Sequence, residues 1–219
     1  MALNQGDMGI RQPTPIRLPP PNQRGSTPLE EAIARRRSIR RFTPEPISRL
    51  ELSQLLWATQ GITDTSPKTR SVPSAGATYP LEIFVLCGHN SVEDVGEGVY
   101  RYDVDNHAIT LHHTGDVRFE LSRAALGQKY VYEAPLDIVI CAVYERTTAY
   151  YGGRGERYVH MEVGHAGQNV YLQATALGLA TVAIGAFRDE QVREVLQLEK
   201  QYQPLYIMPV GRPAKYQGS

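Results

Sequence analysis

The sequence has little of what marks several protein classes. Among its 219 residues are only two cysteines, and 23 basic residues balance 23 acidic ones. The balanced charge argues against nucleic acid as a partner. Cys87 and Cys141 each lie inside an apolar run, which predicts buried thiols in a reduced protein. No apolar run approaches the ~20 residues that span a bilayer, and the N-terminus has no hydrophobic signal core. We therefore expect a soluble, cytoplasmic protein that does not insert into membranes.

Fingerprints for phosphate and metal ligands are also missing. No strand is followed by a dinucleotide or P-loop glycine pattern, which excludes a nucleotide site of the Rossmann kind. Glu162 and His165 stand three residues apart, as in half of a dimetal site, but no second Glu-x-x-His is present. We expect no metal, and interpret this pair as an interface pair or as one that reaches a ligand pocket.

A cluster of five basic side chains over residues 35–41 is the most informative feature that is present. Thr27, Pro28 and Glu30 predict the helix that leads into it, as N-cap, first helical residue and capping-box partner. Arginines at the end of this helix suit the negative end of its dipole. For Arg35 that interpretation and a ligand-binding role both stay open.

The helix dipole does not account for Arg40 and Arg41, because they lie past the helix. Guanidinium groups match phosphate bidentately, and the Ser38 hydroxyl adds a further hydrogen-bonding group. The cluster therefore predicts a phosphate receptor.

The chain divides into an arm and one domain. Residues 1–26 carry five prolines near their end, which predicts an extended arm that is disordered or lies across a neighbouring subunit. Residues 27–219 mix helices and strands irregularly, which favours a single α+β domain. Ser48 and Glu51 form a capping box, and Gly178 is a helix C-cap. We expect helices near 48–60, 117–127, 157–177 and 189–197, strands at 81–87, 99–102, 109–112, 136–143 and 205–210, and a loop over 61–80.

Two segments of small residues let the backbone approach a flat ligand closely. They are Pro73-Ser74-Ala75-Gly76 and Ile184-Gly185-Ala186. Each alone is equally well an ordinary turn. Together with a phosphate receptor they indicate a cofactor with a phosphate at one end and a planar ring at the other.

These motifs occur in the order seen in the FMN-dependent nitroreductases, which the chain resembles over residues 28–213. More narrowly, it resembles the branch known as SagB-type dehydrogenases. The shared markers are Arg36-Arg37-Ser38-Ile39-Arg40, Pro73-Ser74-Ala75-Gly76-Ala77 with Tyr79-Pro80, Arg154-Gly155, Glu162-Val163-Gly164-His165, Val182-Ala183-Ile184-Gly185-Ala186-Phe187 and Pro209-Val210-Gly211-Arg212-Pro213.

The resemblance implies a nitroreductase-like fold, in which helices surround a central, mainly antiparallel sheet. It also implies an intertwined homodimer with FMN at the interface. On that basis Arg36, Ser38 and Arg212 neutralise the flavin phosphate, with Arg37 beside them. Arg40 reaches the ribityl chain and the N1/O2 edge of the ring, where a cation offsets the charge of reduced flavin.

The resemblance further implies roles for the two small-residue segments. Pro73, Ser74, Ala75 and Gly76 line the flavin of the partner subunit. The backbone N–H of Gly185 or Ala186, next to Ile184, faces flavin N5. At Ala77 many nitroreductases have asparagine, so one side-chain contact to the flavin is absent here.

One departure bears on the reaction. Azoline dehydrogenases of the SagB branch carry a lysine-tyrosine pair before the Arg-Gly element, where this chain has Tyr150-Tyr151. Tyrosine, with an ordinary pKa of ~10, is a poor base at neutral pH. We expect Tyr150 and Tyr151 to wall a substrate pocket. Lys129-Tyr130 offers the same pair, but the motif around it does not match.

The leading hypothesis is an FMN-dependent oxidoreductase. It would use NADH or NADPH to reduce nitro, quinone or related conjugated acceptors. The alternatives are a dehydrogenase that oxidises azolines to azoles in a modified peptide, and a non-catalytic flavin-binding subunit of such a peptide-modifying complex.

Overall fold

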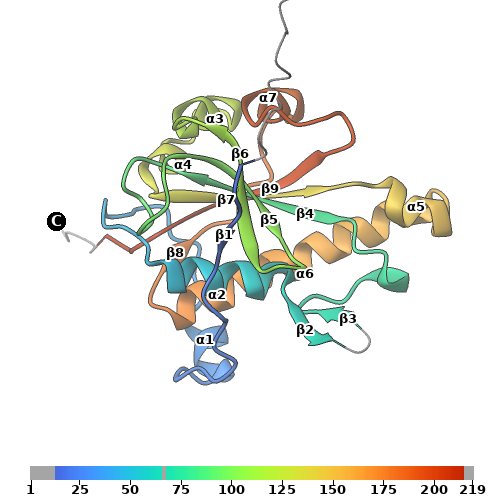
Figure 1. The fold of residues 1–219 in the computed structure, drawn as a ribbon, viewed down its shortest axis with the longest axis horizontal. Helices are drawn as coiled ribbons and strands as arrows, with labels where there is room; N and C mark the ends of the chain where they lie inside the picture. Colours follow the sequence, from blue (N-terminus) through green and yellow to red (C-terminus); the bar gives the residue numbers. More distant parts are fainter. Residues whose placement is uncertain (1–12, 66–67, 215–219) are drawn as a thin grey trace, which may run out of the picture.

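The computed structural model describes residues 13–65 and 68–214. Its centre is a seven-stranded sheet in the order β1-β6-β5-β4-β7-β9-β8, in which every neighbouring pair is antiparallel (Figure 1). The strands are β1 (Ile16–Arg17), β4 (Leu81–Cys87), β5 (Gly98–Asp103), β6 (Ala108–Thr114), β7 (Leu136–Ala142), β8 (Ala180–Thr181) and β9 (Gln203–Gly211). The predicted α+β fold with a mainly antiparallel sheet is confirmed.

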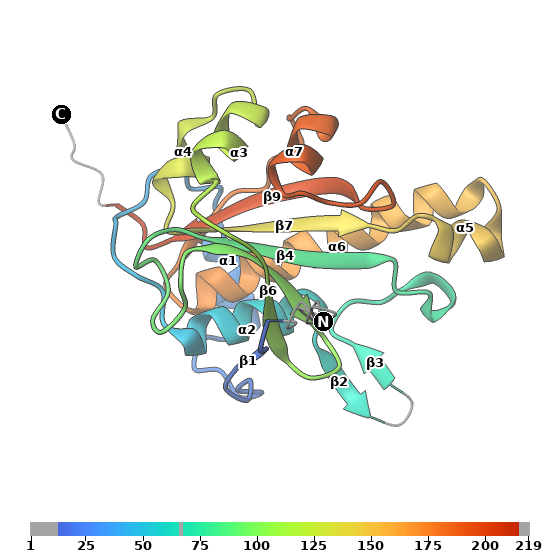
Figure 2. The ribbon, with the colours of Figure 1, turned by 45° about the horizontal axis from the view of Figure 1, so that its top comes forward.

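Helices cover both faces of this sheet. Figure 2 shows α1, α2 and α6 on one face and α3, α4 and α7 on the other. Both faces of β4 and β7 are therefore buried along their whole length, which explains why the two strands read as unbroken apolar runs. The helices are α1 (Leu29–Arg35), α2 (Arg49–Gln60), α3 (Arg118–Ala124), α4 (Lys129–Glu133), α5 (Glu145–Tyr151), α6 (Arg154–Ala176) and α7 (Asp189–Val195), with a 3-10 turn η1 (Ala75–Ala77).

The strongest local signals fold as predicted. Ser48 caps α2 and exchanges both hydrogen bonds of a capping box with Glu51. At the end of α6, Gly178 takes a φ of 71°, and Leu179 N donates to Ala174 O at 2.8 Å. That bond and the one from Gly178 N to Thr175 O form a Schellman motif. Cys87 and Cys141 are free and buried.

Two local predictions are wrong. Pro28, and not Thr27, is the N-cap of α1, and no side chain caps the helix. The Thr27 hydroxyl donates instead to Ala176 O at the end of α6, at 3.3 Å. The expected loop over 61–80 contains the two-stranded ribbon β2 (Ile62–Thr65) and β3 (Lys68–Arg70). These strands are short and polar, so they carry no apolar alternation.

The described part of the arm, residues 13–26, is fastened to its own chain. Its β1 pairs with the start of β6. The Ser53 hydroxyl of α2 donates to Pro19 O at 2.5 Å, and Asn22 N donates to Gln54 Oε1 at 2.8 Å. Residues 1–12 of the predicted arm lie outside the described residues. Within the described part of the chain, no helix is both long and apolar enough to cross a bilayer.

Candidate functional site

The arginine-rich segment leaves α1 in an extended conformation and runs beside β8. Ser38 forms a parallel bridge with Thr181, and Ile39 N donates to Thr181 O at 3.0 Å. Residues 36–40 are therefore placed next to the strand that follows α6, although more than 140 positions separate them in the sequence. This pairing brings two of the predicted cofactor motifs to one edge of the sheet.

Tyr171 of α6 is the junction of the two segments. Its hydroxyl lies 2.8 Å from Ser38 Oγ and accepts the N–H of Ala183 at 2.8 Å. The Arg36 guanidinium stacks over the Tyr171 ring at 5.1 Å. Arg36 and Ser38 thus come together as predicted. No sequence motif marked Tyr171, although an aromatic residue with a polar tip beside the apolar stripe of the longest helix is a usable signal.

The two residues around this junction fit an anionic group. In the described part of the chain, no ion pair engages the half-buried Arg36. Ser38 is exposed, and the buried Thr181 Oγ1 beside it has no hydrogen-bond partner. A guanidinium, a hydroxyl and an orphaned buried hydroxyl make a donor set that suits phosphate.

Arg37 and Arg212 are engaged elsewhere. Arg37 is exposed and donates to the carbonyls of Ala34 and Arg36, so it caps the end of α1. Arg212 donates a bidentate fork to Glu51, with both N···O distances at 3.0 Å. The backbone of Arg212 lies beside the arginine-rich segment, but its charge is neutralised by the carboxylate that also caps α2. The structure does not bring the Arg212 side chain into the predicted receptor.

The small-residue turn after β8 lies against the sheet. Ile184 is buried and forms an antiparallel bridge with Ile207 of β9. Gly185 faces the ring of Tyr206, since a Cβ at this glycine would lie 3.8 Å from Tyr206 Cε1. The backbone of the turn therefore lies next to an aromatic ring. Gly185 and Ala186 add little side-chain bulk, so the backbone stays accessible to a ligand.

Two further side chains connect this turn to Arg40. Gln128 Nε2 donates to Ala186 O at 3.0 Å, and the Tyr130 hydroxyl donates to Gln128 Oε1. The Arg40 guanidinium lies over the Tyr130 ring at 5.8 Å. Arg40 and Ala186 are thus connected through α4. Together with the Tyr171 junction they form the first cluster, which comprises Arg36, Ser38, Arg40, Tyr171 and the 183–186 turn. No sequence motif marked Gln128 or Tyr130 for this role.

The Ser74 loop forms a second, separate cluster. Its 3-10 turn contains Gly76 at a φ of 59°, and Ser74 Oγ accepts the N–H of Tyr79 at 2.9 Å. A Cβ on Gly76 would lie only 2.6 Å from the hydroxyl of Tyr151, so glycine is needed there for two independent reasons. Tyr151 also stacks edge-on against Tyr158 of α6 at 5.1 Å.

The tyrosine pair is divided between two environments. Tyr151 is 39% exposed and packs on the Ser74 loop, whereas Tyr150 is 80% exposed. Both lie on α5, a helix that the sequence analysis did not predict. Lys129 and Tyr130 begin α4 on the opposite face of the sheet from α6 (Figure 2).

The two clusters are separated from each other within one chain. Tyr171 belongs to the first cluster, and Glu162 lies beside Ser74 in the second. The two residues are nine positions apart on α6, which is about 13 Å at 1.5 Å per residue. A planar ligand in contact with both clusters therefore needs a second chain or a long reach.

The comparisons with known proteins decide the family. The profile of the Nitroreductase family matches residues 33–212. This chain belongs to the nitroreductase family. A Methanocaldococcus jannaschii protein named for the same family, MJ1384, is 51% identical over 84% of this chain and 90% of its own length.

Solved structures agree with this assignment. A crystal structure of a Ralstonia eutropha protein that is also named a nitroreductase has a TM-score of 0.81 at 28% identity. The match covers 92% of this chain and 90% of the Ralstonia eutropha chain. A chain of the Escherichia coli microcin synthetase McbBCD complex with truncated pro-MccB17 bound has a TM-score of 0.70 at 26% identity. The match covers 80% of this chain and 67% of the microcin synthetase chain.

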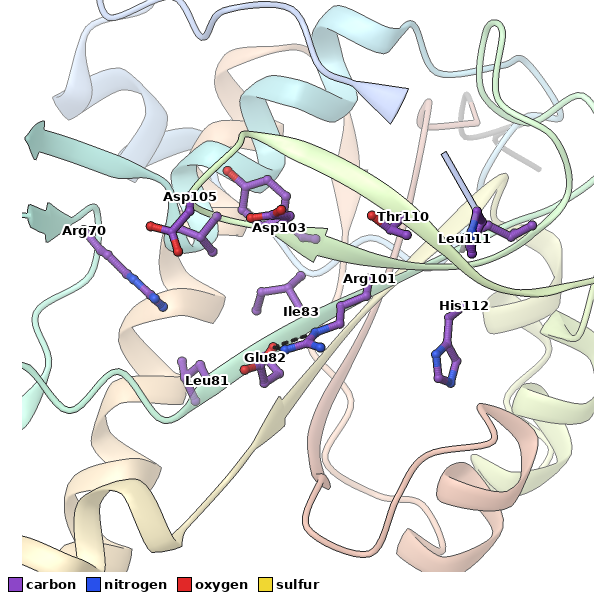
Figure 3. A pocket seen from close by; sticks show the side chains of 13 residues that line it. Arg70, Leu81, Glu82, Ile83, Arg101, Asp103, Asp105, Thr110, Leu111 and His112 are labelled. Carbon is purple, nitrogen blue, oxygen red and sulfur yellow. Dashed lines mark hydrogen bonds and ion pairs between the residues drawn. The ribbon is translucent and has the colours of Figure 1, made fainter. Parts of the chain in front are cut away.

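This nitroreductase-family chain also has a cavity of ≈ 500 Å³ that is lined by Arg70 and by residues of β4, β5 and β6 (Figure 3). Glu82 lies on its floor, paired with Arg101 at 2.9 Å and with Arg146 at 2.5 Å. Arg70 points into the cavity from the β3 side. The Glu82 carboxylate is therefore paired with two guanidinium groups. None of the predicted cofactor residues lines it.

Metal ligands do not gather in the described part of this chain. No group of three His, Cys, Asp or Glu side chains there is arranged to hold an ion. Glu162 is buried within α6 beside the Ser74 loop.

Proposed function

We propose that this chain is an FMN-dependent oxidoreductase that acts as a homodimer in the cytoplasm. It takes electrons from NADH or NADPH and passes them to nitro, quinone or related conjugated acceptors. The observation that carries the proposal is the Tyr171 junction, which places Arg36 and Ser38 together beside the 183–186 turn.

In this proposal the first cluster holds the flavin. Arg36, Ser38 and the orphaned Thr181 hydroxyl bind its phosphate, and Arg40 faces the edge of the ring where reduced flavin is negative. Bound flavin supplies hydride transfer at N5. The backbone N–H of Gly185 or Ala186 would face that atom, and the Tyr206 ring packs against the turn. Arg212 acts indirectly, by fixing α2 through Glu51.

The homodimer is supported by large apolar side chains that α1, α2 and α6 leave exposed. Leu29, Ile33, Leu50 and Met161 are each more than half exposed, and Leu29 and Leu50 line one hollow. Exposed apolar surface of this kind is typical of an interaction site. In such a dimer the Ser74 loop of one chain covers the flavin held by the first cluster of the other, which explains why each chain keeps its two clusters apart.

The first prediction is that the purified protein is a yellow dimer with one FMN per chain. NADH or NADPH should bleach the flavin anaerobically, and a quinone or a nitroarene should restore its colour. Absorbance at the flavin bands and light scattering measure both results. A colourless monomer that stays free of FMN after incubation contradicts the whole proposal. A flavoprotein that neither nicotinamide reduces is instead a dehydrogenase that returns electrons to oxygen.

The second candidate function is oxidation of azolines in a modified peptide, which the likeness to the microcin synthetase chain favours. The residues favour it less, because Tyr150 stands where that branch has lysine. We expect little or no conversion of a thiazoline-containing peptide, and mass spectrometry would detect aromatisation as a loss of about two daltons of hydrogen. Efficient conversion would make azoline oxidation the leading function, with Tyr151, Lys129 or a water as the proton acceptor. A protein that holds FMN but turns over neither class is a flavin-binding subunit.

A further inference from the structure

Glu162 is a carboxylic acid in the middle of α6 with only 3% of its surface exposed. The side chains of Ser74 and Gln60 face its carboxyl group, and Arg70 of β3 acts on it as a cation. Glu162 Oε1 and Gln60 Nε2 both lack a partner at hydrogen-bond geometry, so Gln60 is near the carboxylate without fully satisfying it. A buried, incompletely satisfied acid of this kind calls for an explanation.

Ser74 connects this acid to the loop of the second cluster. Its Oγ atom accepts the N–H of Tyr79, which leaves the hydroxyl hydrogen free to be donated to Glu162. The Tyr79 ring lies under the Arg70 guanidinium at 4.4 Å, and Arg70 Nη1 donates to Gln60 Oε1 at 3.0 Å. Both ends of the loop are therefore fastened to one polar cluster around Glu162.

The backbone of the loop needs this support. Gly76, Ala77 and Tyr79 have φ values of 59°, 53° and 44°. Residues with a Cβ rarely adopt this left-handed region, and such strain persists only where the surrounding structure holds it. Ser74 lies beside the Glu162 carboxyl group, where the loop meets α6, so this is a point at which the helix can support the loop.

We propose that Glu162 is a positioning residue for flavin binding: its ionised carboxylate holds Ser74, and through Ser74 the 74–77 loop, in the conformation that closes on the flavin ring. The inference rests on the proposed function and assigns to it a residue that touches neither flavin nor substrate. Protonated Glu162 is an uncharged and therefore weaker acceptor for the Ser74 hydroxyl, and the loop loosens.

Glu162 gains or loses its proton close to neutral pH. Burial raises its pKa to about 7, while Ser74, Gln60 and Arg70 offset part of the rise. Arg70 is a shared cation, because Glu82 and Asp105 act on it as well. The other charged and titratable groups that act within this cluster are Arg70 and its neighbours Tyr79, Glu82 and Asp105. On α6 itself, Tyr158 and His165 lie about one turn to either side of Glu162 in the sequence.

Two opposite trends follow. FMN binding should weaken by about tenfold in all as pH falls through about 7, because the ionised form is the one that positions the loop. The stability of the FMN-free protein should move the other way. A folded-state pKa above the ordinary 4.5 means that this group's contribution to stability is present at low pH and is lost as pH rises from 4.5 to about 7.

The test compares wild type with Glu162→Gln, which removes the charge at constant size. The exposed Glu156→Gln on the same helix is the matched control. Dissociation constants for FMN are measured by flavin fluorescence on both sides of pH 7. The flavin phosphate itself titrates near pH ~6 in every variant, so the ratio of variant to wild type is the readout. We expect Glu162→Gln to bind about tenfold more weakly at alkaline pH and to converge with wild type at acidic pH, and Glu156→Gln to match wild type throughout.

Ser74→Ala removes the other end of the bond and keeps the test decisive if Glu162→Gln folds poorly, which urea unfolding checks. Ser74→Ala and the double variant should bind FMN equally, within about twofold, because both lack the same contact. A ratio that is constant with pH, or additive losses in the double variant, would overturn the role of Glu162. Absence of FMN binding in wild type would instead overturn the proposed function.

Discussion

Replacing Arg36 with alanine should weaken FMN binding by roughly 10- to 150-fold. A charge-assisted hydrogen bond contributes ~1.5–3 kcal/mol, and 1.4 kcal/mol corresponds to about tenfold in affinity. Arg36 is the cation that the Tyr171 ring and the bridge from Ser38 to Thr181 hold in place, so its geometry is set before the ligand arrives. Titration of the FMN-free protein, followed by quenching of flavin fluorescence, measures the effect.

Arg35→Ala is the matched control for that experiment. Arg35 is the preceding residue, but it is exposed and paired with Glu31 at 2.6 Å. Its loss should change FMN affinity by less than about threefold, since an exposed pair contributes ~0.2–1 kcal/mol at most. Arg36→Lys keeps the charge and loses the fork, so its affinity should fall between those of wild type and Arg36→Ala. If Arg36→Ala binds FMN as tightly as Arg35→Ala does, the phosphate lies elsewhere.

Replacing Asp137 with asparagine should stabilise the folded protein at neutral pH by roughly 1–3 kcal/mol. Asp137 lies in β7 opposite Leu86 and Pro209, is fully buried, and has no hydrogen-bond partner on either oxygen among the described residues. Burial raises its pKa well above the ordinary value, although Arg118 acts in the opposite direction. The isosteric amide fills the same space and carries no charge to bury.

The sign of the effect follows from the raised pKa of Asp137. The unfolded chain loses this proton near pH ~3.9 and the folded chain only at higher pH, so folding stability falls by up to ~1.4 kcal/mol per pH unit in between. Urea unfolding should show the gain of Asp137→Asn at neutral pH and no gain near pH ~4. Asp116→Asn is the opposite control. Its hydrogen bonds with Arg118 lower the pKa of Asp116, so its replacement should destabilise at neutral pH, and less so in acid. A gain for Asp137→Asn that does not change with pH would mean that charge burial is not its cause.

The parts of the fold that could be predicted from sequence are those specified by neighbours along the chain. The Ser48–Glu51 capping box and the Gly178 cap each depend on a few adjacent residues, and both fold as expected. The apolar runs of β4 and β7 report burial on both faces directly. Thr27 does not cap α1, and its hydroxyl instead donates a hydrogen bond to the carbonyl of Ala176, 149 residues away in the sequence.

The candidate site could be predicted only in part, for the same reason. The sequence singled out Arg36 and Ser38 because arginines beside a serine suit phosphate, and the structure places both against Tyr171. Their role in binding phosphate stays a prediction. Arg212 looked equally suitable, but its bidentate partner Glu51 lies 161 residues away. The sequence showed Glu51 only as a helix cap. Tyr171 gains its contacts with Ser38, Arg36 and Ala183 only on folding, so the sequence showed no more than an aromatic residue with a polar tip beside an apolar stripe.

The nine-residue interval between Glu162 and Tyr171 on α6 limits which insertions and deletions this protein can have accepted during evolution. One residue inserted between them would turn the two ends of the helix by about 100° relative to each other and lengthen it by about 1.5 Å. Either Ser74 or Ser38 would then lose its partner on the helix. We therefore expect this lineage to have changed the interval by substitution, and to have confined insertions and deletions to its loops.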